Sequence, residues 1–421
     1  MARRVLLIED DPASQLLVAV SLEGLGYEVL VASDGEAGLK MAQDEHVHAV
    51  LIDLMMPKMH GYEVIQHLRA DPRTRSVPVI VISAQTFASD QRKALELGAN
   101  AFVQKPFRPD EIHALLEKLA WRTRVTFWGV RGSIAAPGPE TVRYGGNTPC
   151  VTVEHNDELL ILDAGTGLRR LGLELMRRGK PSAPGSKALD LNMLITHTHW
   201  DHIQGFPFFV PAYVPGNKLQ IYGPRTIDRP LEKVLRGQMD PVYFPVALGD
   251  MMADIKVTEL RGDPIEIGPF SITYAYMNHP GVTLGYRITV GDHVITYATD
   301  TEPYRYLLKR SRPGDDGEAY GRKRDEHLVD LARDSDLYIA DSQYAPKEYE
   351  AKLGWGHTCY LDAIDIGIAA GARRVALFSH DPMHDDDAVD RKIAHCKEVV
   401  QERGADIEVI GAIEGAHVDL L

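Results

Sequence analysis

The residues of this chain best suited to chemistry lie in one short turn, Thr-His-Thr-His-Trp-Asp-His at 196–202. The turn follows an apolar run that is typical of a buried strand. Its spacing can direct His197 and His199 at one metal ion, and Asp201 and His202 at a second ion beside it. Neutral imidazole and carboxylate are the usual protein ligands of Zn²⁺ and its divalent neighbours. A polar loop of surface histidines is the alternative, which four metal-competent side chains within six residues disfavour.

This turn resembles the His-x-His-x-Asp-His signature of the metallo-β-lactamase fold. The resemblance implies three further ligands at the ends of later strands: His279, Asp300 and His380. The implied sets are His197, His199 and His279 on one ion and Asp201, His202 and His380 on the other, with Asp300 bridging the two. A carboxylate suits the bridge because each oxygen can hold one ion of a close pair. Zn²⁺ is the expected metal and Mn²⁺ or Fe²⁺ the alternatives, because histidine sites do not discriminate sharply.

Three positions distinguish branches of this fold. The antibiotic-hydrolysing branch has Cys at the place of Asp300, and the flavo-diiron branch has Glu at the place of His199. His357, in a Gly-His-Thr sequence, is similar to a histidine of the ribonuclease Z and phosphonate-pathway phosphodiesterase branches, which contacts the scissile phosphate and protonates the leaving oxygen. The resemblance implies phosphodiester hydrolysis with His357, Asp201 and Asp300 as catalytic residues. The structural alternative is a helix-start histidine packed on Trp355, with the following threonine as the N-cap.

A glycine-containing segment at 144–148 resembles the entry loop of the same branch. Its Asn147 and Thr148 are candidates to donate hydrogen bonds to a substrate phosphate, although a plain tight turn explains the glycines equally well. Asp163 and Asp341 each end a buried strand. Asp163 could orient a ligand histidine or cap a helix, and Asp341 is ambiguous in the same way.

A second set of reactive side chains lies in the first 120 residues, each at the end of a short apolar run. Glu9 and Asp10 follow the first run, Asp53 the second, Ser83 the third and Lys105 the fourth. Ligands of a parallel sheet bind at the carboxyl ends of its strands. There the three carboxylates could hold Mg²⁺. Asp53 would be the nucleophile for a phosphoryl group, with Lys105 steadying its charge and Ser83 bonding the new phosphoryl group.

These positions resemble a response-regulator receiver domain across residues 1–120. The resemblance implies that a sensor histidine kinase or phosphotransfer protein phosphorylates Asp53. Receivers transmit this event through the loop of Ser83 and an aromatic residue at the position of Phe102. Phenylalanine replaces the commoner tyrosine here, which keeps the bulk and loses the hydroxyl.

The elements that must position these residues divide the chain into two parts. Within residues 1–120, apolar runs alternate with amphipathic segments, which predicts an α/β fold: a flavodoxin-like five-stranded parallel sheet with helices on both faces. A new pattern begins after the junction at 120–124, and residues 125–421 are expected to form an αββα metallo-β-lactamase-fold domain. The junction has no Gly/Ser/Pro tract, which predicts coupled domains. The polar stretch 310–324 is expected to be an exposed loop.

Composition bounds the partners and the compartment. The chain has 421 residues, a formal net charge of −14 and no basic tract, which disfavours nucleic acid as a partner. Its three cysteines, Cys150, Cys359 and Cys396, form no metal-type pair and suggest a reducing cytoplasm. We expect neither a signal peptide nor a membrane span, and therefore a soluble cytoplasmic protein.

The sequence therefore predicts a two-component response regulator whose output is a di-metal hydrolase. The expected substrate is a small phosphodiester such as a cyclic nucleotide, and phosphorylation of Asp53 would act on a lid or on a homodimer contact. Two alternatives stay open: a thioester or lactone hydrolase, and a non-catalytic di-metal (di-iron) sensor or output scaffold. The sequence does not identify the natural substrate, the metal, the sign of the regulation, the kinase or the oligomeric state.

Overall fold

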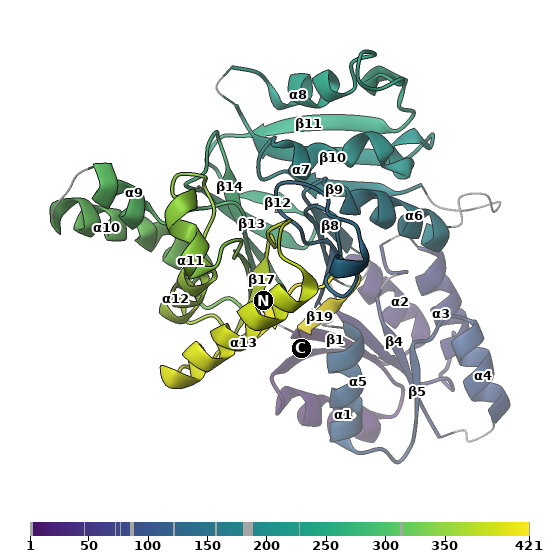
Figure 1. Ribbon diagram of the computed structural model, residues 1–421. Coiled ribbons are helices and arrows are strands. Elements are labelled where there is room, and N and C mark those ends of the chain that lie inside the picture. Colours follow the sequence, from purple (N-terminus) through teal and green to yellow (C-terminus); the bar gives the residue numbers. More distant parts are fainter. Residues whose placement is uncertain are drawn as a thin grey trace. The chain divides into compact units, whose positions relative to one another are not determined.

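The computed structural model describes residues 3–45, 47–71, 73–75, 77–84, 88–120, 123–155, 158–179, 188–226, 228–311 and 315–420. The chain forms two compact units, which divide near residue 123; His155 also groups with the first unit. Residues 121 and 122 of the predicted junction lie outside the described residues. Each unit is described by itself below (Figure 1).

The first unit is a five-stranded sheet in the order β2-β1-β3-β4-β5, and all its strand pairs are parallel. The strands are β1 (Arg3–Ile8), β2 (Tyr27–Ala32), β3 (Ala49–Ile52), β4 (Val79–Ser83) and β5 (Ala101–Gln104). The helices are α1 (Pro12–Glu23), α2 (Gly35–Asp44), α3 (Gly61–Ala70), α4 (Ala88–Glu96) and α5 (Pro109–Ala120).

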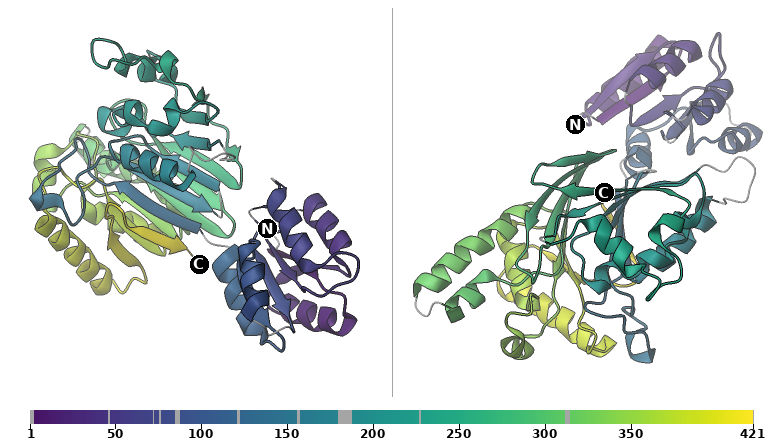
Figure 2. Two further views of the ribbon diagram at one scale, coloured as in Figure 1. Left: turned by 90° about the vertical axis from the view of Figure 1, so that its right-hand side faces the viewer. Right: turned by 90° about the horizontal axis from the view of Figure 1, so that it is seen from above.

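Alternation of side chains along the strands gives this sheet two buried faces. Val5 and Leu7 pack with residues of α1 and α5, whereas Leu6 and Ile8 pack with residues of α2, α3 and α4. Successive residues of a strand point to opposite faces, so a sheet covered on both sides needs continuous apolar strands. The predicted flavodoxin-like fold is confirmed (Figure 2).

The second unit contains two seven-stranded sheets. The first has the order β11-β10-β9-β8-β7-β6-β19 and consists of β6 (Thr123–Gly129), β7 (Cys150–His155), β8 (Glu158–Leu162), β9 (Asp190–Leu194), β10 (Lys218–Pro224), β11 (Asp254–Leu260) and β19 (His417–Leu420). The second has the order β12 to β18 and consists of β12 (Ile265–Ile267), β13 (Phe270–Tyr276), β14 (Leu284–Val290), β15 (His293–Ala298), β16 (Leu337–Asp341), β17 (Arg374–Phe378) and β18 (Glu408–Gly411).

The two sheets share one apolar core, which contains Phe127 and Leu160 of the first sheet and Tyr286 and Phe378 of the second. Helices cover both outer faces: α6 (Gly167–Gly179) and α8 (Leu231–Gln238) pack on the first sheet, and α10 (Asp315–Ala332), α12 (Tyr360–Ala370) and α13 (Asp386–Glu402) on the second. Short helices α7 (Trp200–Ile203) and α11 (Pro346–Tyr349), and α9 (Tyr304–Ser311), complete the unit. The predicted αββα architecture is confirmed (Figure 1).

The polar stretch 310–324 was expected to be a loop, and this prediction was wrong. Its described residues belong to α9 and α10, while residues 312–314 lie outside the described part. Glu318 of α10 accepts hydrogen bonds from Arg322, one turn later, and pairs with Lys309 of α9 at 2.9 Å. Such pairs support a helix that is mostly polar, which composition alone does not reveal. Among the described residues, no helix is both long enough and apolar enough to cross a membrane.

Candidate active site

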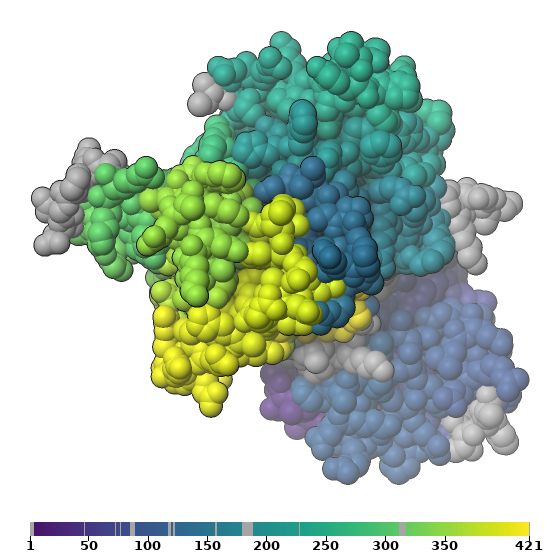
Figure 3. Space-filling model, in the orientation of Figure 1, coloured from purple at the N-terminus to yellow at the C-terminus, as the bar shows by residue number. Residues whose placement is uncertain are grey.

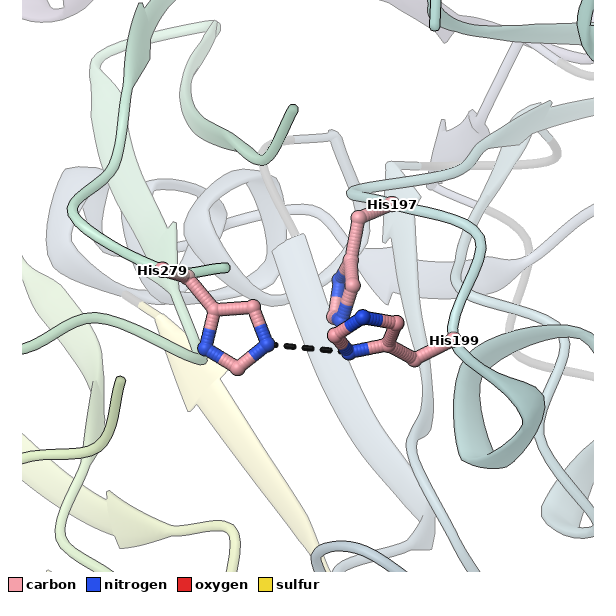
Figure 4. Close-up of side chains that lie close together, drawn as sticks. All are labelled: His197, His199 and His279. Carbon is pink, nitrogen blue, oxygen red and sulfur yellow. Dashed lines mark hydrogen bonds between the residues drawn. The ribbon is translucent and has the colours of Figure 1, made fainter. Parts of the chain in front are cut away.

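Three histidines converge from the two sheets of the second unit (Figure 4). His197 and His199 follow strand β9, and His279 follows strand β13. His279 Nε2 lies 3.0 Å from His199 Nδ1, and one ring nitrogen of each histidine lies within 4.8 Å of the others. Imidazoles packed this closely would repel one another if they were protonated. As neutral rings, they can together ligate a divalent cation.

Asp300, at the end of β15, lies between these histidines and a second group. Its Oδ2 is 3.5 Å from His197 Nε2 and 3.7 Å from His279 Nε2. Its Oδ1 is 3.3 Å from His202 Nε2. His202 Nε2 is also 3.3 Å from Asp201 Oδ2. Each carboxylate oxygen of Asp300 therefore faces a different set of nitrogens, as a bridging ligand would require.

Two atoms of this cluster test whether a cation fits. His197 Nε2 and His202 Nε2 are buried and have no hydrogen-bond partner within the described part of the chain. A buried polar atom without a partner is costly, so such atoms call for an explanation. Burial also holds the pKa of His197 well below its usual range, which keeps this imidazole neutral and able to ligate a metal. The nitrogen and carboxylate donors fit Zn²⁺, Mn²⁺ or Fe²⁺.

Asp163 holds His202 in position from behind. Its Oδ2 lies 2.8 Å from His202 Nδ1 and accepts a 2.9 Å hydrogen bond from the Tyr297 hydroxyl, and its Oδ1 accepts one of 2.7 Å from the Thr196 amide. A hydrogen bond at Nδ1 fixes the ring so that Nε2 faces the two aspartates. Asp163 and Asp300 both have positive φ angles, 61° and 52°, which few non-glycine residues adopt and which are enriched at functional sites.

His357 lies beside the cluster in the turn before α12. Its Nε2 is 4.0 Å from Asp300 Oδ2, and its Nδ1 is 3.0 Å from Asp341 Oδ2. Burial alone would lower the pKa of His357, but the carboxylates of Asp341 and Asp300 outweigh it and raise the pKa to about 9. The alternative role for this turn, with Thr358 as the helix N-cap, does not match the structure: Cys359 is the N-cap residue, and the Thr358 hydroxyl donates to the Thr301 carbonyl.

His380, the last predicted ligand, is not brought into the cluster. Its Nε2 lies 3.0 Å from the Ala412 carbonyl oxygen and its Nδ1 lies 3.3 Å from Lys392 Nζ. The preceding residue, Ser379, has a positive φ of 56°. The chain therefore bends at this strand end, and the His380 side chain is fully buried. The next residue, Asp381, lines the active-site cavity instead.

Asn147 and Thr148, the predicted phosphate contacts, also lie elsewhere. Asn147 Nδ2 donates to Glu414 Oε1 at 2.8 Å, and Thr148, which is fully buried, exchanges hydrogen bonds with Thr166. Neither residue lines the cavity. Their segment instead packs against the C-terminal part of the chain, seen as blue against yellow in Figure 3. In this structure the two side chains link parts of the unit to one another, and their contact with substrate stays a prediction.

A cavity of about 670 Å³ opens over the cluster. Besides predicted residues such as Asp201, Asp300 and His357, it is lined by Lys352, Trp355 and Asp381, which sequence reasoning did not assign to the site. Lys352 Nζ lies 2.9 Å from Asp381 Oδ2. Asp381 could have been suspected because it adjoins His380 at a strand end, but no sequence signal marks Lys352.

The first unit brings its own predicted residues together. Carboxylate oxygens of Glu9, Asp10 and Asp53 lie within 4.8 Å of one another. Lys105 Nζ lies 2.6 Å from both Glu9 Oε2 and Asp53 Oδ2. The Lys105 amide donates to the Ser83 carbonyl at 2.8 Å, so the ends of β4 and β5 adjoin at this site.

Phe102, the predicted switch residue, lies on β5 beside this site. It is half-buried and packs against the core that β1, β3 and β4 form with α2, α3 and α4.

Comparison with known families agrees with this division. The family model described as the beta-lactamase superfamily domain matches residues 159–380, just over half of the chain. The chain therefore belongs to the beta-lactamase superfamily. The model of the response regulator receiver domain matches residues 5–117, so a receiver domain is fused to the N-terminal side of the metallo-β-lactamase-fold domain.

Among curated proteins, the chain is 38% identical over 121 residues to a probable transcriptional regulator, ycf27, of Cyanophora paradoxa, covering 29% of this chain and 49% of that protein. It is 36% identical over 140 residues to the DNA-binding dual master transcriptional regulator RpaA of Synechocystis sp., covering 33% and 58%. The chain spans about half the length of the curated relatives it matches.

Among solved structures, the metallo-β-lactamase fold protein YhfI from Bacillus subtilis is 22% identical with a TM-score of 0.49, covering 71% of this chain and 100% of that one. The short form of human tRNase Z is 18% identical with a TM-score of 0.46, covering 70% and 98%. The receiver domain of a sensor histidine kinase from Pseudomonas aeruginosa is 30% identical with a TM-score of 0.28, covering 28% and 98%.

Proposed function

We propose that this protein is a two-component response regulator whose output is a di-metal phosphodiesterase. The observation that carries the proposal is the position of His357: it lines the cavity of the metal-competent cluster and has Asp341 behind its other nitrogen. A hydrolase that releases an alkoxide needs a proton donor in this place.

Six residues would hold the metals. His197, His199 and His279 would ligate one ion, Asp201 and His202 the other, and Asp300 both. His380 is left out of the set because contacts with Ala412 and Lys392 engage both its ring nitrogens. Bound divalent ions would supply Lewis-acid activation of water and of the phosphate oxygens.

The charge of the cavity supports an anionic substrate only when cations are bound. The lining carries three carboxylates, Asp201, Asp300 and Asp381, and Lys352 is its single Lys or Arg among the described residues. Alone, this arrangement would repel a phosphodiester. With divalent ions held by the histidines and by Asp201 and Asp300, the buried end of the cavity would be positively charged and would suit the phosphate.

His357 would donate the proton. With a pKa raised to about 9 it carries a proton at neutral pH. Because Nδ1 is engaged with Asp341, the proton on Nε2 is the one directed toward Asp300 and the cavity. The residue is thus a positioned general acid for the leaving oxygen.

In the receiver, Asp53 would accept a phosphoryl group from a sensor histidine kinase or a phosphotransfer protein. Glu9, Asp10 and Asp53 would hold Mg²⁺, and Lys105 already contacts Asp53. The phosphorylated receiver would control the hydrolase through the Ser83 loop and Phe102.

The leaving group provides the test of His357. p-Nitrophenolate departs without protonation, whereas the alkoxide released from a 3′,5′-cyclic nucleotide needs a proton. We expect His357→Ala to lower kcat/KM by about 100-fold or more on the cyclic nucleotide and far less on bis(p-nitrophenyl) phosphate, with metal content unchanged. His417→Ala, an exposed histidine outside the cavity, is the matched control.

Two results would contradict the proposal. An equal loss of kcat/KM on both substrates would show that His357 does not act as the proton donor. Undiminished hydrolysis of thioesters or lactones, together with no hydrolysis of either diester, would favour the ester-hydrolase alternative.

A further inference from the structure

Two exposed tryptophans stand at the opening of the active-site cavity. Trp200 is 81% exposed and Trp355 is 61% exposed, and both line the cavity that contains Asp300 and His357. Trp200 directly follows His199, and Trp355 lies two residues before His357. Trp200 is the first residue of α7 and Trp355 lies in the segment before α12, so the two indoles reach the cavity from different parts of the unit.

This exposure is unusual within the chain. Of its four tryptophans, Trp128 is buried and donates from Nε1 to the Thr152 hydroxyl at 3.0 Å, and Trp121 lies outside the described residues. A large aromatic surface normally gains free energy by burial. Two indoles left in solvent at one opening indicate a surface that is covered when a ligand binds. Met383, which is 85% exposed, adds a third apolar side chain to the same lining.

The cavity thus has two chemically different ends. Its buried end carries Asp300 and His357, which are 2% and 7% exposed, and its open end carries the tryptophans. Apart from His357 at the buried end, Lys352 is the one cationic side chain of the described lining, and it is already paired with Asp381 and lies over the Tyr344 ring at 4.4 Å. A polyanion would find no further cation at this opening within the described lining, whereas a single flat ring would find two aromatic partners.

We propose that Trp200 and Trp355 bind a planar aromatic group carried by the scissile phosphodiester, and so determine which diesters the enzyme accepts. This inference rests on the proposed phosphodiesterase function. The ring can be a nucleobase or a simple aryl group, since both present a π-face to an indole.

The test measures binding rather than turnover. Phosphate monoesters, the products of such a hydrolysis, are titrated calorimetrically into the metal-loaded full-length protein. The pairs are phenyl phosphate against methyl phosphate and thymidine 5′-phosphate against ribose 5-phosphate. We expect the aromatic member of at least one pair to bind about tenfold more tightly. Preference in the thymidine pair alone identifies a nucleobase site, and preference in the phenyl pair identifies a general aryl site.

Substitutions assign the preference to the indoles. Trp355→Ala and Trp200→Ala should each remove most of it, and Trp355→Phe should restore part. Tyr243→Ala removes a residue that is 79% exposed but does not line the cavity, and should keep the full preference. Because Trp200 adjoins ligand candidates, metal content is measured for each variant.

Equal binding of aromatic and aliphatic monoesters, or a preference that survives in both tryptophan variants, would overturn the inference. These outcomes are independent of catalysis: a protein that hydrolyses diesters without this preference refutes the aromatic site alone. A protein that shows the preference and hydrolyses nothing supports the aromatic site and refutes the proposed function.

Discussion

Single carboxylates determine what the neighbouring histidines of this protein can do. Asp163 is fully buried and directs His202 through a 2.8 Å contact at Nδ1, which leaves Nε2 for the cluster. Asp341 makes the corresponding contact with His357 at 3.0 Å. In both places the surrounding carboxylates outweigh burial and raise the pKa of the histidine. The contact at Nδ1 also fixes each ring so that its Nε2 faces Asp300.

The pH dependence of turnover should report the His357–Asp341 pair. A general acid works only while protonated, so kcat on a substrate with an alkoxide leaving group should be maintained below about pH 9 and fall as the pH rises through about 9. Asp341→Asn removes the largest cause that raises this pKa. The alkaline limb should then move to lower pH, toward the ordinary histidine value of about 6.5. An alkaline limb that stays in place in Asp341→Asn would show that another group controls it.

Residue types and spacing predicted much of this site because the ligand candidates end apolar strands. The spacing within the turn 197–202 pointed to His197, and the resemblance to the metallo-β-lactamase fold then implied His279 and Asp300, each of which follows an apolar run. The direction in which the side chains after a strand end point could not be predicted in the same way. At the end of β17 the positive φ of Ser379 accompanies an inward His380, and Asp381 takes the cavity position.

At the scale of elements, turns between strand and helix hold the site together. Gly356 has a φ of 85°, a left-handed conformation that favours glycine. A Cβ at this position would lie 2.4 Å from His279 Nδ1 and 2.4 Å from Pro280 Cδ. The Gly356 carbonyl also lies 2.8 Å from His279 Nδ1, so this turn orients the ring of His279.

Gly356→Ala should therefore displace His279 and weaken metal binding. We expect metal affinity to fall about 10- to 100-fold, as for other losses of a contact that orients a ligand. Competition with a chromogenic chelator measures it. Gly237→Ala, in helix α8 with no atom within 4 Å of the added Cβ, is the control and should bind metal like the parent. Unchanged affinity in Gly356→Ala would mean that His279 is not held by this turn.

Some elements could be predicted from sequence patterns, and one helix could not. The alternation of apolar runs and amphipathic segments in residues 1–120 correctly predicted a parallel sheet with helices on both faces. Continuous apolar strands must be buried on both sides, and few folds other than this one do so. Helix α10 was missed because its support comes from charged pairs such as Glu318–Arg322 and from packing of its end, where Leu331 is buried. The first is local to the helix, whereas the burial of Leu331 depends on tertiary neighbours that a polar composition does not disclose.

For the whole molecule, the two units carry two separate chemistries on one chain. The receiver groups three carboxylates and a lysine at the ends of its strands, and the second unit groups histidines and carboxylates under a cavity with an aromatic opening. In both units the candidate residues follow apolar runs of the sequence, and resemblances to two families implied their roles. The coupling between the units was predicted only from the composition of residues 120–124, and it stays a prediction, because linker composition sets stiffness but not the direction of a signal.

The most direct test is hydrolysis of bis(p-nitrophenyl) phosphate by the full-length protein loaded with Zn²⁺ or Mn²⁺, with and without acetyl phosphate as a small phosphodonor. Asp53→Asn, which removes the phosphoryl acceptor, is the matched control. We expect turnover that requires the metal, a rate that changes with acetyl phosphate in the parent, and a rate that does not change in Asp53→Asn. Absence of turnover with either metal, with and without acetyl phosphate, would contradict the account.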